Sequence, residues 1–188
     1  MQHLQSRSAG GHWVLKAPDH VFALDALQEV YPDARFVFVH RDPMRVVASV
    51  ARLTQLLRTP FARYVSPTRT GREVTEDWAC AAAIMVELDS RQLIDPARVV
   101  HVLYSDLVAR PLATVERIYG HFGLTLAPVA AKAMRRLVAA DPRGGYGRNY
   151  YNLADYGIDP EEIRDSFDDY VLCLGVPAEL GQAKSTTA

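Results

Sequence analysis

The sequence predicts an α/β protein with three layers, in which a parallel sheet is covered by helices. Three short apolar segments, residues 12–17, 35–40 and 98–104, have the length and composition of strands. Longer segments with helical periodicity separate them. Strands that alternate with helices form parallel sheets, because each crossover helix returns the chain to the same end of the sheet.

The length and composition favour one domain without a membrane span. A chain of 188 residues that is 49% hydrophobic can bury a core, so we expect a single domain over residues 1–188 with flexible ends at 1–11 and 176–188. The net charge of −1 gives no indication of a nucleic-acid partner or of general binding to membrane surfaces. No apolar run approaches the roughly 20 residues that cross a bilayer. Since residues 1–11 also lack the apolar core of a signal peptide, a cytoplasmic location is expected.

The cysteines and histidines predict no metal site, because none of them has companions at metal-ligand spacing. Cys80 and Cys173 are expected to be free, buried thiols in a reducing compartment.

The helices are predicted from apolar periodicity and from their start signals. An amphipathic helix is expected over residues 20–30, and a second over 43–57, where Asp42 is a good N-cap and Pro43 a good first residue. In the second helix we expect the large aliphatic side chains to face the core, namely Val46, Val50, Leu53 and Leu57.

The second half of the chain is predicted to be mainly helical. Further helices are expected over residues 73–94, 111–122, 127–139 and 160–173. Two segments rich in Gly, Pro, Arg or Tyr are predicted to be loops, 58–72 and 141–157. The first is a plausible lid over a substrate, and the second has the composition of a functional loop.

Arg41 and Ser49 are the best candidates for a binding site. An apolar strand leads to Arg41, the chain turns through Asp42 and Pro43, and a helix then carries Ser49. A guanidinium fork, a hydroxyl and the partial positive charge of a helix start can hold a phosphate group. Ser49 lies about 10 Å along the axis, so one anion touches both groups only if Arg41 extends along the helix. The alternative is that Arg41 pairs with a neighbouring carboxylate and that Ser49 faces solvent.

Four sequence motifs in the same order resemble the bacterial branch of the sulfotransferases that use 3′-phosphoadenosine 5′-phosphosulfate (PAPS). They are Trp13–His20 with Lys16-Ala17-Pro18-Asp19, Arg41 with Ser49, Tyr104-Ser105-Asp106-Leu107, and Tyr150 with Tyr156-Gly157-Ile158-Asp159. The resemblance covers most of residues 12–175. It implies a fold like that of P-loop kinases and transfer of a sulfonate group from PAPS to a hydroxyl acceptor, which could be a small molecule, a lipid or a carbohydrate.

The resemblance also implies roles for particular residues. Lys16 corresponds to a lysine at a strand end that holds the sulfonate or the bridging oxygen. His20 is the best candidate for the general base, although animal members carry a histidine at the position of Pro18, and a structural hydrogen bond is the alternative role. Arg41 and Ser49 resemble the 3′-phosphate motif. The remaining candidates for cofactor binding are Tyr104 at the adenine and Arg143 and Arg148 at the 3′-phosphate.

One part of the family pattern is absent from the sequence. The strand, loop and helix that hold the 5′-phosphosulfate have no counterpart, because the nearest candidate, residues 6–11, precedes a strand. The chain therefore resembles the C-terminal portion of a longer family member and is expected to be truncated at its N-terminal side. The absent strand would separate those ending near Arg41 and Tyr104, which then either pair directly or expose their edges. We therefore expect low stability alone, with self-association or a partner chain at an open edge. A non-catalytic remnant or an interaction subunit is the alternative function.

Overall fold

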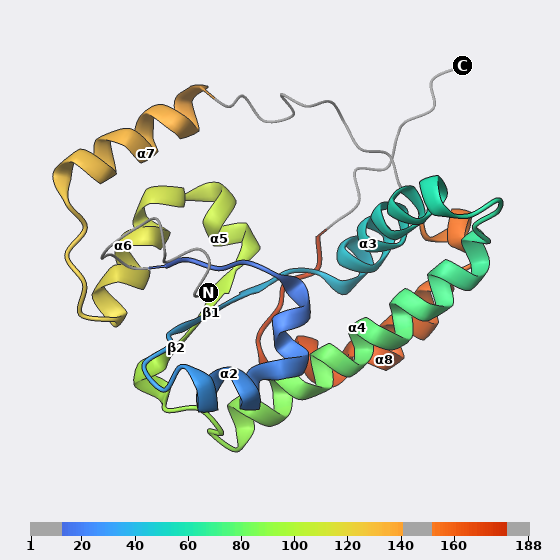
Figure 1. Cartoon of the computed structure of the whole chain (residues 1–188), viewed down its shortest axis with the longest axis horizontal. Helices are drawn as coiled ribbons and strands as arrows, with labels where there is room; N and C mark the ends of the chain where they lie inside the picture. Colours follow the sequence, from blue (N-terminus) through green and yellow to red (C-terminus); the bar gives the residue numbers. More distant parts are fainter. Residues whose placement is uncertain (1–12, 141–151, 180–188) are drawn as a thin grey trace.

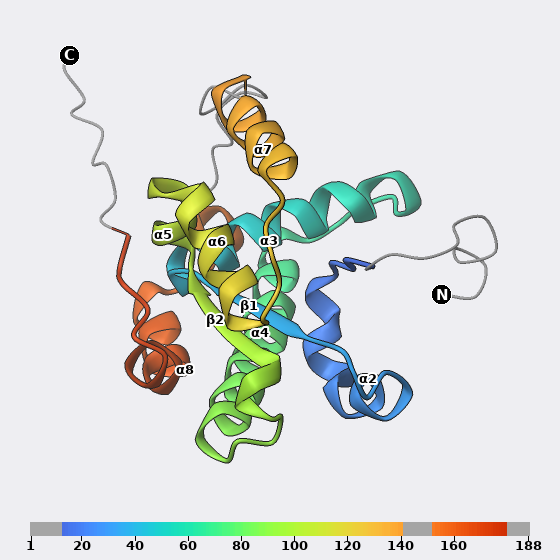
Figure 2. The ribbon, with the colours of Figure 1, turned by 90° about the vertical axis from the view of Figure 1, so that its left-hand side faces the viewer.

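A parallel sheet of two strands lies at the centre of the computed structural model, which describes residues 13–140 and 152–179. The strands are β1 (Phe36–His40) and β2 (Val99–Leu103), and their last residues, His40 and Leu103, lie side by side. Helices surround this sheet (Figures 1 and 2). The predicted α/β class with a parallel sheet covered by helices is confirmed, and of the two arrangements left open for the strands, direct pairing is the one present.

Helices account for most of the described chain. Short 3₁₀ segments are η1 (Pro18–Ala23), η2 (Thr59–Phe61), η3 (Pro96–Arg98) and η4 (Leu153–Tyr156). The α-helices are α2 (Leu24–Val30), α3 (Pro43–Arg58), α4 (Pro67–Ser90), α5 (Tyr104–Ala109), α6 (Pro111–His121), α7 (Pro128–Ala140) and α8 (Pro160–Cys173).

The predicted strand over residues 12–17 is wrong. Its described part, residues 13–17, has no regular structure, and Val14 is 92% exposed. An apolar segment becomes a strand only when a neighbouring strand takes its backbone hydrogen bonds, and neither β1 nor β2 pairs with it.

The predicted loop over residues 58–72 is also largely wrong. The helix that precedes it ends at Arg58, η2 follows directly, and α4 begins at Pro67. Ser66 caps α4, because its hydroxyl accepts a hydrogen bond from the backbone N–H of Arg69 at 3.3 Å. Ser followed by Pro is a helix-start signal that the composition of this segment obscured. Only residues 62–66, between the end of η2 and the start of α4, form a loop.

The core is organised around α4, which packs against α3, η4 and α8 on one side and against η1 on the other. On α3 the buried face consists of the small residues Val47, Ala48 and Ala51, whereas the predicted core residues Leu53 and Leu57 are exposed. Small side chains let α4 and α8 approach α3 closely, so Leu53 and Leu57 are left outside, whereas Val50 packs against the core as predicted.

Two further expectations need correction. Cys80 and Cys173 are exposed, because each lies on the outer face of its helix. Of the end expected to be flexible, residues 176–179 are described, and Val176 is buried among residues of α3, α4 and α8.

Gly71 tests the packing of α4 against η4. A Cβ atom at this position would lie 2.4 Å from the carbonyl oxygen of Tyr156, which is too close for any side chain. We predict that Gly71→Ala lowers the free energy of unfolding by about 2 kcal/mol, measured by urea denaturation. Gly120→Ala is the matched control, because a Cβ there meets no atom within 4 Å and should stabilise α6 by up to about 1 kcal/mol. Equal effects of the two substitutions would contradict this account.

Candidate functional site

The sheet brings Arg41 and Tyr104 together. β1 and β2 are parallel and in register, so the residues that follow their carboxyl ends meet at one edge of the sheet. The Arg41 guanidinium carbon lies 4.2 Å from the centre of the Tyr104 ring, in a cation–π contact. A fixed cation beside an aromatic ring can bind an anion attached to a flat base.

The guanidinium of Arg41 already holds an anion from a distant part of the chain. Arg41 Nε donates to Oε1 of Glu179 at 2.6 Å, and Nη2 donates to Oε2 at 2.9 Å. This is the bidentate geometry that guanidinium adopts with carboxylate or phosphate. The alternative considered for Arg41, pairing with a carboxylate, is therefore present in this structure, and an external anion would have to displace Glu179.

Asp42 connects this carboxylate to the start of α3. Its Oδ1 accepts from the backbone N–H of Met44 at 2.9 Å, which confirms the predicted N-cap, and its Oδ2 accepts from the backbone N–H of Glu179 at 2.7 Å. The segment 176–179 is thus a strap, anchored by buried Val176 at one end and by Asp42 and Arg41 at the other.

Ser49 lies half-buried on α3, two turns after the cap. Within the described residues no hydrogen bond joins it to Arg41. It shares the outward face of the helix with Arg45, one turn before it, and Leu53, one turn after it. The hydroxyl is therefore placed on the side of the helix that is not used for the core.

The other candidate residues are more dispersed. Lys16 is exposed in the irregular segment 13–17, and His20 is half-buried in η1, with its backbone N–H donating to the Ala17 carbonyl at 3.2 Å. Neither makes a hydrogen bond or ion pair to Arg41 among the described residues. Arg143 and Arg148 lie outside the described residues.

A chain of hydrogen bonds that the sequence did not predict runs from the backbone of Arg41 through Tyr170 and His40 to His101. The Tyr170 phenol lies 3.0 Å from His40 Nδ1, and His40 Nε2 lies 2.8 Å from His101 Nδ1. The backbone of Arg41 hydrogen-bonds to the same phenol. If the phenol accepts from Arg41, its proton points to His40, and His40 in turn donates to His101, whose far nitrogen faces Asp89.

Burial keeps this network neutral. Desolvation and the neighbouring His101 lower the pKa of His40 from 6.5 to about 4, and desolvation also lowers the pKa of His101, although Asp89 opposes that shift. Desolvation raises the pKa of Tyr170 to about 12. No sequence signal marks these residues as partners, because Tyr170 is 130 residues from His40.

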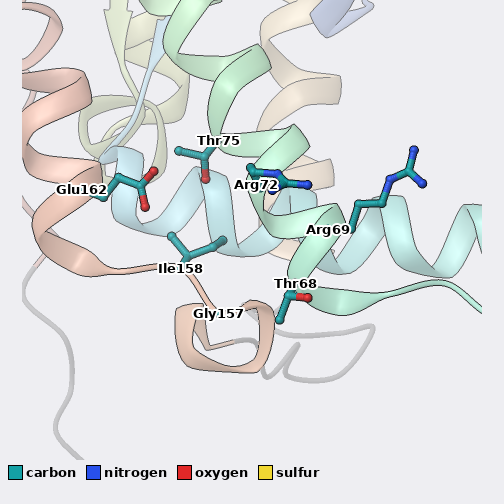
Figure 3. Close-up of a pocket in the computed structure, with 7 residues that line it drawn as sticks. All are labelled: Thr68, Arg69, Arg72, Thr75, Gly157, Ile158 and Glu162. Atoms are coloured by element: carbon teal, nitrogen blue, oxygen red, sulfur yellow. The ribbon is translucent and has the colours of Figure 1, made fainter.

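A separate pocket of about 310 Å³ lies between α4, η4 and the start of α8. Figure 3 shows its lining, which consists of Thr68, Arg69, Arg72, Thr75, Gly157, Ile158 and Glu162. It includes Gly157 and Ile158 of the fourth motif but none of the described candidate residues. Arg69 is paired with Glu73 at 2.7 Å, and Glu162 adds negative charge to the wall, so we assign this pocket no ligand.

Residues 13–140 and 152–179 contain neither a membrane-spanning helix nor a cluster of metal-ligating side chains. No helix there is both long and apolar enough to cross a bilayer. No group of three His, Cys, Asp or Glu side chains there has the arrangement of a metal site.

The fold and the site define an α/β protein with an anion-binding arginine at the carboxyl edge of a parallel sheet. The model of the sulfotransferase family matches residues 1–128, and the chain belongs to that family.

Relatives and solved structures agree with this assignment. The omega-hydroxy-beta-dihydromenaquinone-9 sulfotransferases Stf3 of Mycobacterium bovis and Mycobacterium tuberculosis are 31% identical over 143 residues, which is 74% of this chain and 35% of theirs. The structure of sulfotransferase STF9 from Mycobacterium avium matches with a TM-score of 0.78 at 29% identity, over 94% of this chain and 45% of that one. STF1 from Mycobacterium tuberculosis matches with a TM-score of 0.71 at 35% identity, over 87% and 41%. The chain thus spans about a third of the length of the curated relatives it matches.

The histidine pair predicts an acid-sensitive fold. His40 has a lower pKa in the folded protein than in the unfolded chain, so the unfolded chain binds more protons below pH 6.5 and stability is lost as the pH falls. We predict that the free energy of unfolding decreases by about 2 kcal/mol between about pH 7 and about pH 5, measured by denaturant titration. His40→Gln should flatten this dependence, whereas exposed His121→Gln should leave it intact. A stability that is constant or rises on acidification would be inconsistent with a neutral buried His40.

Proposed function

We propose that this chain is a sulfotransferase polypeptide that binds the 3′-phosphate side of PAPS at Arg41. Arg41 would hold the phosphate, with Ser49 as a second donor, and Tyr104 would contact the adenine. The observation that carries the proposal is the bidentate grip of Arg41 on a carboxylate, 4.2 Å above the Tyr104 ring. The carboxylate of Glu179 stands in for an anion there, so the donors present fit a phosphate. Arg143 and Arg148 would add charge to the same phosphate.

Sulfonate transfer also needs a group that stabilises negative charge and a base, and we assign these roles to Lys16 and His20. An acceptor hydroxyl attacks the sulfur, the bond to the bridging oxygen breaks, and adenosine 3′,5′-bisphosphate leaves. Lys16 would stabilise the charge on the sulfonate or bridging oxygen, and its exposure leaves it able to reach a ligand. His20 would take the proton from the acceptor hydroxyl, since a neutral imidazole has a ring nitrogen that can accept it.

The acceptor class is inferred from the relatives. The Stf3 proteins are named for a hydroxylated dihydromenaquinone, so we propose a hydroxylated, lipid-like acceptor for this chain and activity in the cytoplasm. The function is tested by incubating the chain with radiolabelled PAPS and hydroxylated lipids. Transfer of label that decreases in His20→Ala supports the proposal. Binding of adenosine 3′,5′-bisphosphate without any transfer would instead indicate the non-catalytic remnant.

Arg41 is the residue on which nucleotide binding depends most. Charge-assisted hydrogen bonds contribute about 1.5–3 kcal/mol, so Arg41→Ala should weaken binding of adenosine 3′,5′-bisphosphate by about 10–100-fold in isothermal titration calorimetry. The affinity of Arg41→Lys should fall between those of the parent chain and Arg41→Ala, because lysine keeps the charge but loses the planar fork of the guanidinium. Exposed Arg135→Ala on α7 is the control and should bind like the parent chain. Unchanged affinity in Arg41→Ala would refute the assignment.

Replacing Glu179 should raise the affinity for the nucleotide, whereas replacing Arg41 should lower it. Replacing Glu179 with glutamine removes the charge that competes for Arg41 but keeps the shape of the strap. We predict that Glu179→Gln binds adenosine 3′,5′-bisphosphate about tenfold more tightly, since a charged hydrogen bond no longer has to be broken first. Glu116→Gln, at an exposed position on α6, controls for the change in net charge. If Glu179→Gln binds no better than this control, the strap does not compete with the nucleotide.

A further inference from the structure

Residues 43–72 have a charge composition unlike the rest of the chain. They contain six arginines and no lysine, aspartate or glutamate, although the whole chain carries a net charge of only −1. The arginines are Arg45, Arg52, Arg58, Arg63, Arg69 and Arg72. This segment covers α3, η2, the connection 62–66 and the start of α4. The net charge of the whole protein therefore conceals a strongly basic surface.

Large apolar side chains are exposed on the same segment. Their exposed fractions lie between 51% and 91%, and they are Leu53, Leu56, Leu57, Phe61 and Tyr64. The three leucines occupy one face of α3 at helical spacing, and Phe61 continues that face one turn later. In Figure 1 the end of α3 and its turn into α4 form the right-hand edge of the molecule. We call these five residues, with Arg52 and Arg63 beside them, the Arg–Leu face.

The positive charge of the Arg–Leu face is not neutralised locally. Within the described residues, Arg52 and Arg63 form no ion pair. Glu73, the first acidic residue after the segment, is shared by Arg58 and Arg69 at 2.6 and 2.7 Å, so this group of three keeps a positive charge. Those two arginines also lower the pKa of Glu73, which keeps its carboxylate ionised and paired with them.

We propose that the Arg–Leu face docks on an anionic lipid bilayer. Exposed leucine and aromatic side chains flanked by arginines are the composition of a helix that lies in the membrane interface. The arginines would meet lipid phosphates, and the apolar side chains would enter the region below them. A symmetric contact between two copies is disfavoured, because it would bring two arginine-rich surfaces together.

The position of the face suggests a use that rests on the proposed function. Ser49 lies on the outward side of α3 one turn before Leu53, so docking would hold the nucleotide-binding end of α3 close to the lipid surface. A hydroxylated lipid could then be reached without leaving the bilayer. Docking itself requires neither nucleotide nor acceptor and can be measured separately.

Vesicle co-sedimentation of the full 188-residue chain tests the proposal. One set of vesicles contains phosphatidylcholine alone, and the other contains equal parts of phosphatidylcholine and phosphatidylglycerol. We expect binding to the anionic vesicles only, decreasing as salt screens the arginines. Each arginine near such a surface contributes about fivefold in affinity, so Arg52→Gln combined with Arg63→Gln should lose about 25-fold. Leu57→Ser combined with Phe61→Ser should abolish binding.

Matched controls exclude general effects of charge or folding. Arg135→Gln with Arg136→Gln removes two exposed arginines from α7, and Leu172→Ser removes an exposed leucine of α8. Both should bind as the parent chain does, and circular dichroism should show that all variants remain folded.

Three outcomes would overturn the proposal. These are no preference for anionic vesicles, equal losses in the controls, or a dimer in size-exclusion chromatography that Leu57→Ser with Phe61→Ser converts to monomer. The last result would make the face an interface between copies of the chain.

Discussion

The guanidinium of Arg41 is the point at which the parts of this structure meet. The parallel pairing of β1 and β2 places it over Tyr104, the capping carboxylate of Asp42 fixes the turn that follows it, and the phenol of Tyr170 holds its backbone. Tyr170 is in turn hydrogen-bonded to buried His40, whose other ring nitrogen contacts half-buried His101. Because sheet, helix start and core all constrain one side chain, the fork is presented in a set direction, which is what tight binding of a planar or tetrahedral anion requires.

The guanidinium of Arg41 is bound by Glu179 in this structure, so a nucleotide must compete with this carboxylate. A carboxylate of the protein and a phosphate of the nucleotide compete for the same donors, so the affinity measured for the nucleotide is the difference between two similar interactions. Within the described residues, the strap is held by the buried side chain of Val176, by the hydrogen bond from the Val176 backbone N–H to the Val171 carbonyl, and by Asp42 and Arg41. Release of Glu179 alone would remove this carboxylate from Arg41 and leave Val176 in the core, since β1, α3 and Tyr104 keep their other contacts.

The sequence was informative where local chemistry decides structure and uninformative where distant partners decide it. Asp42 and Pro43 predicted the start of α3, and the apolar run 35–40 predicted β1, because caps and buried strands depend on neighbouring residues. The run 12–17 is also apolar, but in the described part of the chain neither strand pairs with residues 13–17. The leucines of α3 have the right spacing but are exposed. Glu179 lies 138 residues from Arg41, so no spacing rule could identify it as a partner. Family resemblance singled out Arg41 and Tyr104, but their contact depends on the parallel pairing of β1 and β2, which no sequence spacing reveals.

The most direct test of the central claim compares two ligands on the unmodified chain. Adenosine 3′,5′-bisphosphate and adenosine 5′-monophosphate differ only in the 3′-phosphate, the group assigned to Arg41. Calorimetry should show that the bisphosphate binds about tenfold more tightly, because its 3′-phosphate carries about two negative charges whereas the Glu179 carboxylate that it displaces from Arg41 carries one. Equal affinities for the two nucleotides would mean that Arg41 does not bind the 3′-phosphate, and the assignment of this site would fail.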